Sequence, residues 1–183
     1  MGEEFGVPAR YPEGRTLEED LGLWWILYTK PRCERQIVQY LLNRDISYYL
    51  PLYRRKIRYG NLRRTRTREL PLFNGYICFA LDKQDHNLLY DCKKFVRIIR
   101  VDSQARFVKE MQAVVQAVET QDDLLVRGGL TPGRRILILS GPMMGHEGVI
   151  VRLRGKKHLA LSVKMFNQTV LVRLDPETML EPV

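Results

Sequence analysis

The sequence predicts an α+β protein of two domains: an N-terminal α/β sandwich with a small, mainly antiparallel sheet and flanking helices, and a small C-terminal β-barrel. Residues 22–120 carry the first pattern, in which apolar strand-like runs alternate with amphipathic helical stretches. Four short β-type runs, separated by glycine-containing turns, follow Pro132-Gly133 and predict the barrel. With 183 residues, of which 45% are hydrophobic, the chain can bury a core of this size.

The domain boundaries follow from shifts in composition. Residues 1–21 mix proline, glycine and acidic residues without a period, so we expect a flexible N-terminal tail. Residues 121–130 contain Asp122-Asp123 and Gly128-Gly129, which predict a linker between the sandwich, 22–120, and the barrel, 131–183.

The elements of the first domain follow in order. The apolar run Leu23–Tyr28 predicts a central strand, and Pro31 predicts the start of a helix with Thr29 as a possible cap. A second long amphipathic helix is expected from Ser103. Further strands are expected at Tyr48–Tyr53, Tyr76–Leu81 and Val96–Ile99, with a short helix at Gln84–Asp91.

A formal net charge of +9 predicts a polyanionic partner, most commonly nucleic acid, and the surplus is concentrated in residues 24–130. Two polar runs around Gly60-Asn61 predict a projecting hairpin. Like charges on facing strands repel, so this hairpin is expected to contact DNA or nascent RNA, the alternative being a mobile, solvated hairpin. The hairpin residues assigned to nucleic acid are Arg54, Arg55, Arg58, Arg63, Arg64 and Arg66.

Enzyme activity is not expected. The three histidines lack metal-ligand spacing, and the sequence holds no phosphate-binding loop or nucleophile elbow, so we assign no catalytic residue, metal or cofactor. The three cysteines cannot all pair internally and are read as reduced thiols. No apolar run is long enough to span a bilayer, so we expect a cytoplasmic protein without a membrane partner.

Two motifs resemble the NusG family of transcription factors. Trp24–Tyr28 and Leu72–Phe79 are similar to its N-terminal NGN domain, and Pro132–Ile150 is similar to its KOW module. The resemblance implies an NGN sandwich followed by a five-stranded, SH3-like KOW barrel, in a monomer. KOW modules also occur in ribosomal proteins, so a ribosome-associated RNA-binding protein is an alternative.

Leu27–Lys30 and Pro71–Phe73 are closer to specialised paralogues of the RfaH type than to the housekeeping factor, which couples transcription to Rho or the ribosome. The His-Thr-Thr element with which RfaH contacts the polymerase β subunit is absent, and His86–Tyr90 stands in its place. The valine-, isoleucine- and leucine-rich KOW segment favours a permanent barrel over the helical hairpin that RfaH adopts.

The resemblance also implies sites. An apolar patch would bind the clamp helices of the polymerase β′ subunit, and the edge at the first helix would face upstream DNA and the non-template strand. The KOW module would bind a small-subunit ribosomal protein or Rho. The residues concerned are Phe73, Tyr76 and Cys78 for polymerase, Lys30, Arg32 and Arg35 for DNA, and Met143, Met144 and Phe166 for the KOW partner.

Each apolar assignment has a core residue as its alternative, and that alternative is preferred for Ile77 and Phe79. Together the motifs predict a transcription elongation and antitermination (processivity) factor that binds the clamp and nucleic acid and catalyses nothing itself.

Overall fold

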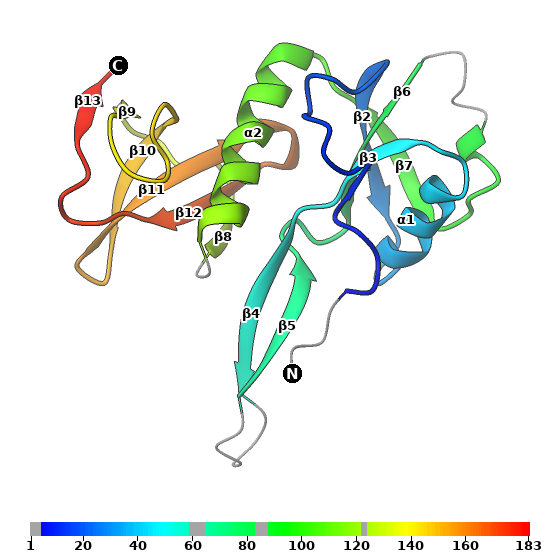
Figure 1. Cartoon of the computed structure of the whole chain (residues 1–183), viewed down its shortest axis with the longest axis horizontal. Helices are drawn as coiled ribbons and strands as arrows, with labels where there is room; N and C mark the ends of the chain where they lie inside the picture. The colour runs from blue at the N-terminus through cyan, green and yellow to red at the C-terminus, as the bar shows by residue number, and fades with distance from the viewer. Residues whose placement is uncertain (1–4, 59–64, 83–87, 122–123) are drawn as a thin grey trace. The chain divides into compact units, whose positions relative to one another are not determined.

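The computed structural model describes residues 5–58, 65–82, 88–121 and 124–183. Within these ranges the fold is α+β, which confirms the predicted class, and consists of two α-helices and several antiparallel sheets. The chain divides into two compact units, Met1–Ala105 and Arg106–Val183. Figure 1 shows the helices and strands of both, most of them labelled.

A five-stranded sheet forms the centre of the first unit, in the order β1-β3-β6-β2-β7, and all its pairings are antiparallel. The two apolar runs seen in the sequence, β2 and β6, lie next to each other inside the sheet, where apolar side chains can be buried on both faces. The strands are β1 (Arg10–Tyr11), β2 (Leu23–Thr29), β3 (Ser47–Tyr49), β6 (Tyr76–Leu81) and β7 (Phe95–Arg100).

Helix α1 (Glu34–Leu42) packs on one face of this sheet. Trp25 faces Phe79 and Leu27 faces Ile77 across the β2–β6 ladder, so these four side chains share a face. They form one buried cluster with the apolar stripe of α1, which consists of Ile37, Val38 and Leu41. The prediction that Ile77 and Phe79 are core residues is therefore confirmed.

The start of α1 differs from the prediction. Thr29 still belongs to β2, where its N–H donates to the carbonyl of Gly75 at 2.8 Å, so it does not cap the helix. Arg32 then adopts a positive φ of 61°, and the helix begins only at Glu34. A bulky residue in this left-handed region is uncommon, and local sequence preferences gave no signal for it.

Residues 5–21, which we expected to be a flexible tail, pack against the sheet. Strand β1 pairs with β3, the Leu50 N–H donates to the Ala9 carbonyl at 2.7 Å, and the Tyr48 hydroxyl donates to the Pro8 carbonyl at 2.9 Å. Leu17 is buried, and its carbonyl accepts the indole N–H of Trp24 at 3.0 Å. The segment therefore extends the sheet at the β3 edge.

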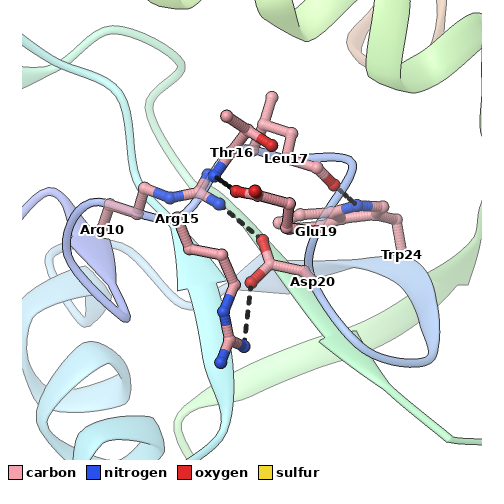
Figure 2. A network of polar contacts seen from close by, with 7 residues as sticks. All are labelled: Arg10, Arg15, Thr16, Leu17, Glu19, Asp20 and Trp24. Carbon is pink, nitrogen blue, oxygen red and sulfur yellow. Dashed lines mark hydrogen bonds and ion pairs between the residues drawn. The ribbon is translucent and has the colours of Figure 1, made fainter.

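A polar network fixes the end of this segment (Figure 2). Arg10 Nη2 donates to Asp20 Oδ2 at 2.7 Å, Arg15 Nη1 lies 3.8 Å from Asp20 Oδ1, and the Thr16 N–H donates to Glu19 Oε2 at 2.6 Å. The Asp20 side chain is inaccessible to solvent. Burial raises the pKa of Asp20 above its ordinary value, and the nearby Arg10 guanidinium opposes that rise.

Asp20→Asn is expected to change the stability at neutral pH by less than about 1 kcal/mol, because the amide oxygen can still accept from Arg10. Asp20→Ala removes the acceptor and should cost about 1–3 kcal/mol. Because the pKa of Asp20 is higher in the folded chain than in the unfolded chain, the folded state favours the protonated carboxyl. The stability that protonated Asp20 contributes is complete below the unfolded-state pKa and is lost as the pH rises through the folded-state pKa. Urea unfolding measured from neutral to acidic pH should show this pH dependence of the unfolding free energy in the native chain but not in Asp20→Asn. Identical pH profiles of the two chains would contradict the raised pKa of Asp20.

Strands β4 (Leu52–Arg58) and β5 (Thr65–Pro71) form the predicted hairpin as a separate two-stranded sheet. The ribbon extends away from the five-stranded sheet of its unit in Figure 1. The expected single strand Tyr48–Tyr53 is instead divided between β3 and β4 at Leu50-Pro51. The predicted turn at Gly60-Asn61 and the first half of the predicted helix Gln84–Asp91 lie outside the described residues.

The second unit contains a six-stranded antiparallel sheet in the order β13-β9-β10-β11-β12-β8. Four of its strands match the four predicted runs, and β8 and β13 flank them. Its members are β8 (Leu124–Gly128), β9 (Arg135–Ile138), β10 (Glu147–Leu153), β11 (Lys156–Val163), β12 (Gln168–Arg173) and β13 (Leu180–Pro182). Strand β8 falls inside the segment 121–130 that we expected to be a linker, and it pairs with β12 over five residues, Leu124 to Gly128.

Helix α2 (Gln104–Thr120) contributes to the second unit from Arg106 onward. Phe107 packs edge-on against Phe166 at a centroid distance of 6.4 Å, and Lys109 pairs with Glu147 at 2.8 Å. The N–H of Lys164, the first residue of the 3-10 helix η2 (Lys164–Phe166), donates to Glu110 Oε2 at 3.0 Å. This part of α2 therefore groups with the sheet of residues 124–183, whereas we expected all of it in the first domain.

Candidate nucleic-acid interface

The loop between β2 and α1 places three predicted basic residues, Lys30, Arg32 and Arg35, at one edge of the first unit. All three are exposed. Lys30 and Arg32 precede the helix and only Arg35 lies on it, which corrects the expectation that all three belong to the helix start. The N–H of Lys30 donates to the carbonyl of Lys94 at 2.9 Å, so the loop is joined to the residues before β7.

A second loop, Phe73–Gly75, lies against the same edge. Gly75 adopts a φ of 81°, which favours glycine, and its N–H donates to the Glu34 carboxylate at 3.0 Å. Because its carbonyl accepts from Thr29, this turn is fixed to both β2 and α1. The result is that Tyr76 lies beside Tyr28, with ring centroids 5.2 Å apart.

Between these loops is a cavity of about 640 Å³. Its walls combine aromatic and proline rings with exposed guanidinium groups, and the Glu34 carboxylate that reaches it is already bonded to Gly75. The volume is within the range of small-molecule and cofactor sites, roughly 300–1,000 Å³. The lining residues are Phe5, Tyr28, Pro31, Arg32, Glu34, Arg35, Gln36, Pro71, Asn74 and Gly75.

The basic surface extends to β7 through residues that the sequence analysis did not single out. Arg97 lies over the Tyr28 ring at 5.7 Å, and Lys94 and Arg97 are exposed. Tyr28 therefore lines the cavity and also lies next to Arg97. The sequence alone gave no signal for this pair, because only the pairing of β2 with β7 places Arg97 opposite Tyr28.

The three residues assigned to polymerase differ in exposure. Phe73 and Cys78 are buried, with 1% and 2% of their surface exposed, and Tyr76 is half-buried. Tyr76 and Cys78 lie on the sheet face opposite the α1 cluster, as expected from alternation in β6. Burial raises the pKa of the Cys78 thiol, so this side chain is a neutral apolar group.

The hairpin presents exposed cations. Arg54, Arg55, Lys56 and Arg66 are exposed, and Arg54 lies 3.7 Å from Glu69. Arg55 faces Arg68 across the two strands, which places like charges opposite each other. The backbone of Arg58 ends β4, and the predicted residues Arg63 and Arg64 lie outside the described residues.

In the second unit the three predicted partner residues also differ. Met144 is 66% exposed, whereas Met143 and Phe166 are 2% and 4% exposed. The contacts of helix α2 explain part of this burial: Phe107 lies against Phe166, and the Thr120 hydroxyl donates to Met143 Sδ at 3.9 Å. Of the predicted set, Met144 is the residue available at the surface.

Metal and membrane features are not seen in the part of the chain that the structure describes. There, no group of three or more histidine, cysteine or acidic side chains is placed to hold a metal ion. His158 is buried with its ring bonded to the Lys156 carbonyl, and burial with the nearby Lys109 lowers the pKa of His146. No helix among the described residues combines the length and the apolar character needed to cross a bilayer.

Comparison with known proteins gives a family match to residues 22–126 under the description "Transcription termination factor nusG". No curated protein matches the chain. One similar solved structure is that of Thermotoga maritima NusG, described as showing its domain interaction. It is 18% identical to this chain, with a TM-score of 0.48, and the alignment covers 88% of this chain and 97% of that chain. The MjSpt4:Spt5 complex in its conformation B has 15% identity, the same coverages and a TM-score of 0.30.

These two structural likenesses are too weak to carry an argument on their own. The family match is different, because residues 22–126 are more than half of the 183-residue chain. The chain therefore belongs to the NusG family, whose members are non-enzymatic transcription factors that act in elongation and bind RNA polymerase.

Proposed function

We propose that this chain is an elongation and antitermination (processivity) factor that binds the clamp helices of the polymerase β′ subunit and the nearby DNA. The observation that carries the proposal is the position of Tyr76, whose ring lies beside that of Tyr28, a residue that lines the arginine-containing cavity. One edge of the first unit can thus offer aromatic surface to a protein and cations to nucleic acid. Aromatic residues and arginine are also the residues most enriched in protein interfaces.

The polymerase contact is assigned to Phe73, Tyr76 and Cys78. Tyr76 would make the direct contact, because it keeps exposed surface. Phe73 and Cys78 are buried on either side of Tyr76 in the sequence, so they would contribute contact surface only if this segment changed conformation on binding.

The nucleic-acid contact is assigned to Lys30, Arg32 and Arg35 together with the hairpin cations. Among the described residues neither Lys30 nor Arg32 forms an ion pair, which leaves both charges available to phosphate groups. The partner at this edge is the upstream DNA with its non-template strand, and the hairpin binds the same DNA or the nascent RNA.

The second unit would recruit a small-subunit ribosomal protein or Rho. Met144 supports this proposal because an exposed methionine suits an adaptable apolar interface. Met143 and Phe166 would take part only after Phe107 and Thr120 of α2 moved away from them. Recruitment by the KOW partner site would then depend on the position of α2.

The mechanism requires no chemistry from the chain, which would act as a monomer in the cytoplasm. By binding the elongating polymerase more tightly than the paused state, the factor would shift the population toward elongation. We favour a specialised paralogue of the RfaH type over the housekeeping factor because of the Leu27–Lys30 and Pro71–Phe73 motifs. A ribosome-associated KOW protein is disfavoured, since the family match covers the N-terminal motifs.

Tyr76→Ala is expected to weaken binding to core RNA polymerase by about 10-fold or more, because an aromatic anchor at the centre of an interface commonly contributes about 2 kcal/mol. Leu21→Ala serves as the control, since Leu21 is an apolar residue of the same unit with 77% of its surface exposed. Titration of labelled polymerase with each full-length variant measures the affinities. Equal affinities for Tyr76→Ala and the native chain would remove the proposed polymerase contact.

A further inference from the structure

The N-terminal segment 5–21 lies outside the matched family region, residues 22–126, yet it contributes to the cavity at the basic edge. Its course is fixed at several points by β1 and by the bonds from Leu50 and Tyr48. These contacts bring its first described residue, Phe5, next to α1 and β5. The family region alone therefore does not contain every wall of the cavity.

Phe5 is held by two contacts with different elements. Its N–H donates to Glu69 Oε2 of β5 at 3.1 Å, and the Arg35 guanidinium of α1 lies over its ring at 5.2 Å. The ring is half-buried, so part of it remains accessible. The following residue, Gly6, has a φ of 78°, and a Cβ at this position would lie 3.6 Å from the Arg35 guanidinium carbon. The positive φ favours glycine at this turn, which lies in van der Waals range of Arg35.

The chemistry of the cavity matches one class of ligand. Phe5 and Tyr28 offer aromatic ring surfaces, and Arg32 and Arg35 provide cations beside them. The two arginines outnumber the one lining carboxylate, that of Glu34, which accepts a hydrogen bond from the Gly75 N–H. A nucleotide combines a planar ring, which stacks on aromatic groups and guanidinium planes, with a phosphate that pairs with arginine.

We propose that Phe5 completes a site that takes one unstacked nucleotide of a single strand, and that the segment 5–21 is therefore a functional part of the interface. The inference rests on the proposed nucleic-acid contact of the first unit and adds a segment outside the family region to it. Base stacking on Phe5 and Tyr28 requires a free base face, which a paired and stacked base in a duplex does not present. Phe5 therefore confers a preference for single strands, whereas Arg32 and Arg35 bind phosphate in either form.

The test uses the full-length chain and a short fluorescently labelled oligonucleotide of mixed sequence, offered as single-stranded DNA, as RNA of the same sequence and as duplex DNA. Fluorescence anisotropy measures the dissociation constants. Phe5→Ala should weaken single-strand binding by about 10-fold, a typical result of removing one stacking partner, and leave duplex binding unchanged. Phe5→Tyr, which keeps a ring, should retain native affinity. A loss with DNA or with RNA alone identifies the strand that the site prefers.

The control is Leu21→Ala, which removes an apolar side chain that lies on the same segment but is 77% exposed and outside the cavity. Thermal unfolding of Phe5→Ala checks that the fold is retained. Unchanged single-strand affinity in a folded Phe5→Ala chain overturns the inference. The double variant Arg32→Ala/Arg35→Ala separates this failure from a failure of the proposed function. If this variant binds both single-stranded and duplex oligonucleotides more weakly, nucleic-acid binding at this edge stands without Phe5. If its affinity for both is unchanged, the proposed nucleic-acid contact itself fails.

Discussion

Replacing Arg55 and Lys56 by glutamate is expected to weaken binding to a polymerase elongation complex by about 100-fold at 0.1 M salt. Each phosphate contact releases about one condensed counterion, which corresponds to roughly 10-fold in affinity under these conditions. Both side chains are exposed on the hairpin, so each can reach a phosphate without unfolding the strands. The slope of log affinity against log salt should fall by about 2 as these contacts are lost.

The same substitutions make a second prediction about stability, of opposite sign. Arg55 faces Arg68 across the β4–β5 ladder, so Arg55→Glu replaces a repulsive cross-strand pair with an attractive one. Thermal unfolding should therefore show an unchanged or slightly higher midpoint in a chain that binds more weakly. Loss of affinity through unfolding would instead lower the midpoint, so the two causes are separable in one set of samples.

The matched control changes the net charge by the same amount on strands that are not part of the hairpin. Arg152→Glu and Arg173→Glu reverse two exposed arginines on β10 and β12 of the second unit. If binding depended only on the overall charge of +9, both double variants would lose affinity equally. Comparable losses, or native affinity in the hairpin variant, would show that the hairpin is a solvated element rather than a contact.

The features that the sequence predicted well are those set by local periodicity. The alternation of β2 and β6 placed Ile77 and Phe79 in the core and Tyr76 on the other face, because side chains in a strand alternate strictly. The hairpin was also predicted, since two polar runs that cannot be buried have to project from the domain. The position of Tyr76 beside Tyr28 follows from the pairing of their two strands.

The features that the sequence did not predict depend on contacts between distant residues. Thr29 is an acceptable helix cap by composition, but its N–H bonds to Gly75, 46 positions along the chain, which extends β2 and delays α1. Leu124–Val126 is a short apolar run between Asp122-Asp123 and Gly128-Gly129, and only its pairing with β12 makes it a strand. Phe5 carries no local signal at all, because its role arises where the N-terminal segment meets α1 and β5.

The N-terminal segment offers the sharpest test of such distant contacts. A chain that begins at Gly22 is expected to lose about 2–4 kcal/mol of unfolding free energy, an effect at the upper end of those seen for single lesions. Deletion removes the partner of β3 and leaves that strand as a bare edge. It also removes the carbonyl oxygens that accept from the Trp24 indole and from the Tyr48 hydroxyl. Because both side chains are buried, these donors would be left without a partner at a cost in stability. A flexible tail would instead leave the stability unchanged.

Two leucines of the segment allow the same question to be asked without a deletion. Leu17 is 4% exposed and Leu21 is 77% exposed, although they are four positions apart. Leu17→Ala leaves a cavity beside Trp24 and should cost about 2–3 kcal/mol, whereas Leu21→Ala should cost less than about 0.5 kcal/mol. Urea unfolding followed by tryptophan fluorescence measures both. Equal effects of the two substitutions would mean that the segment does not pack on the sheet in solution, and Phe5 would then have no fixed position at the cavity.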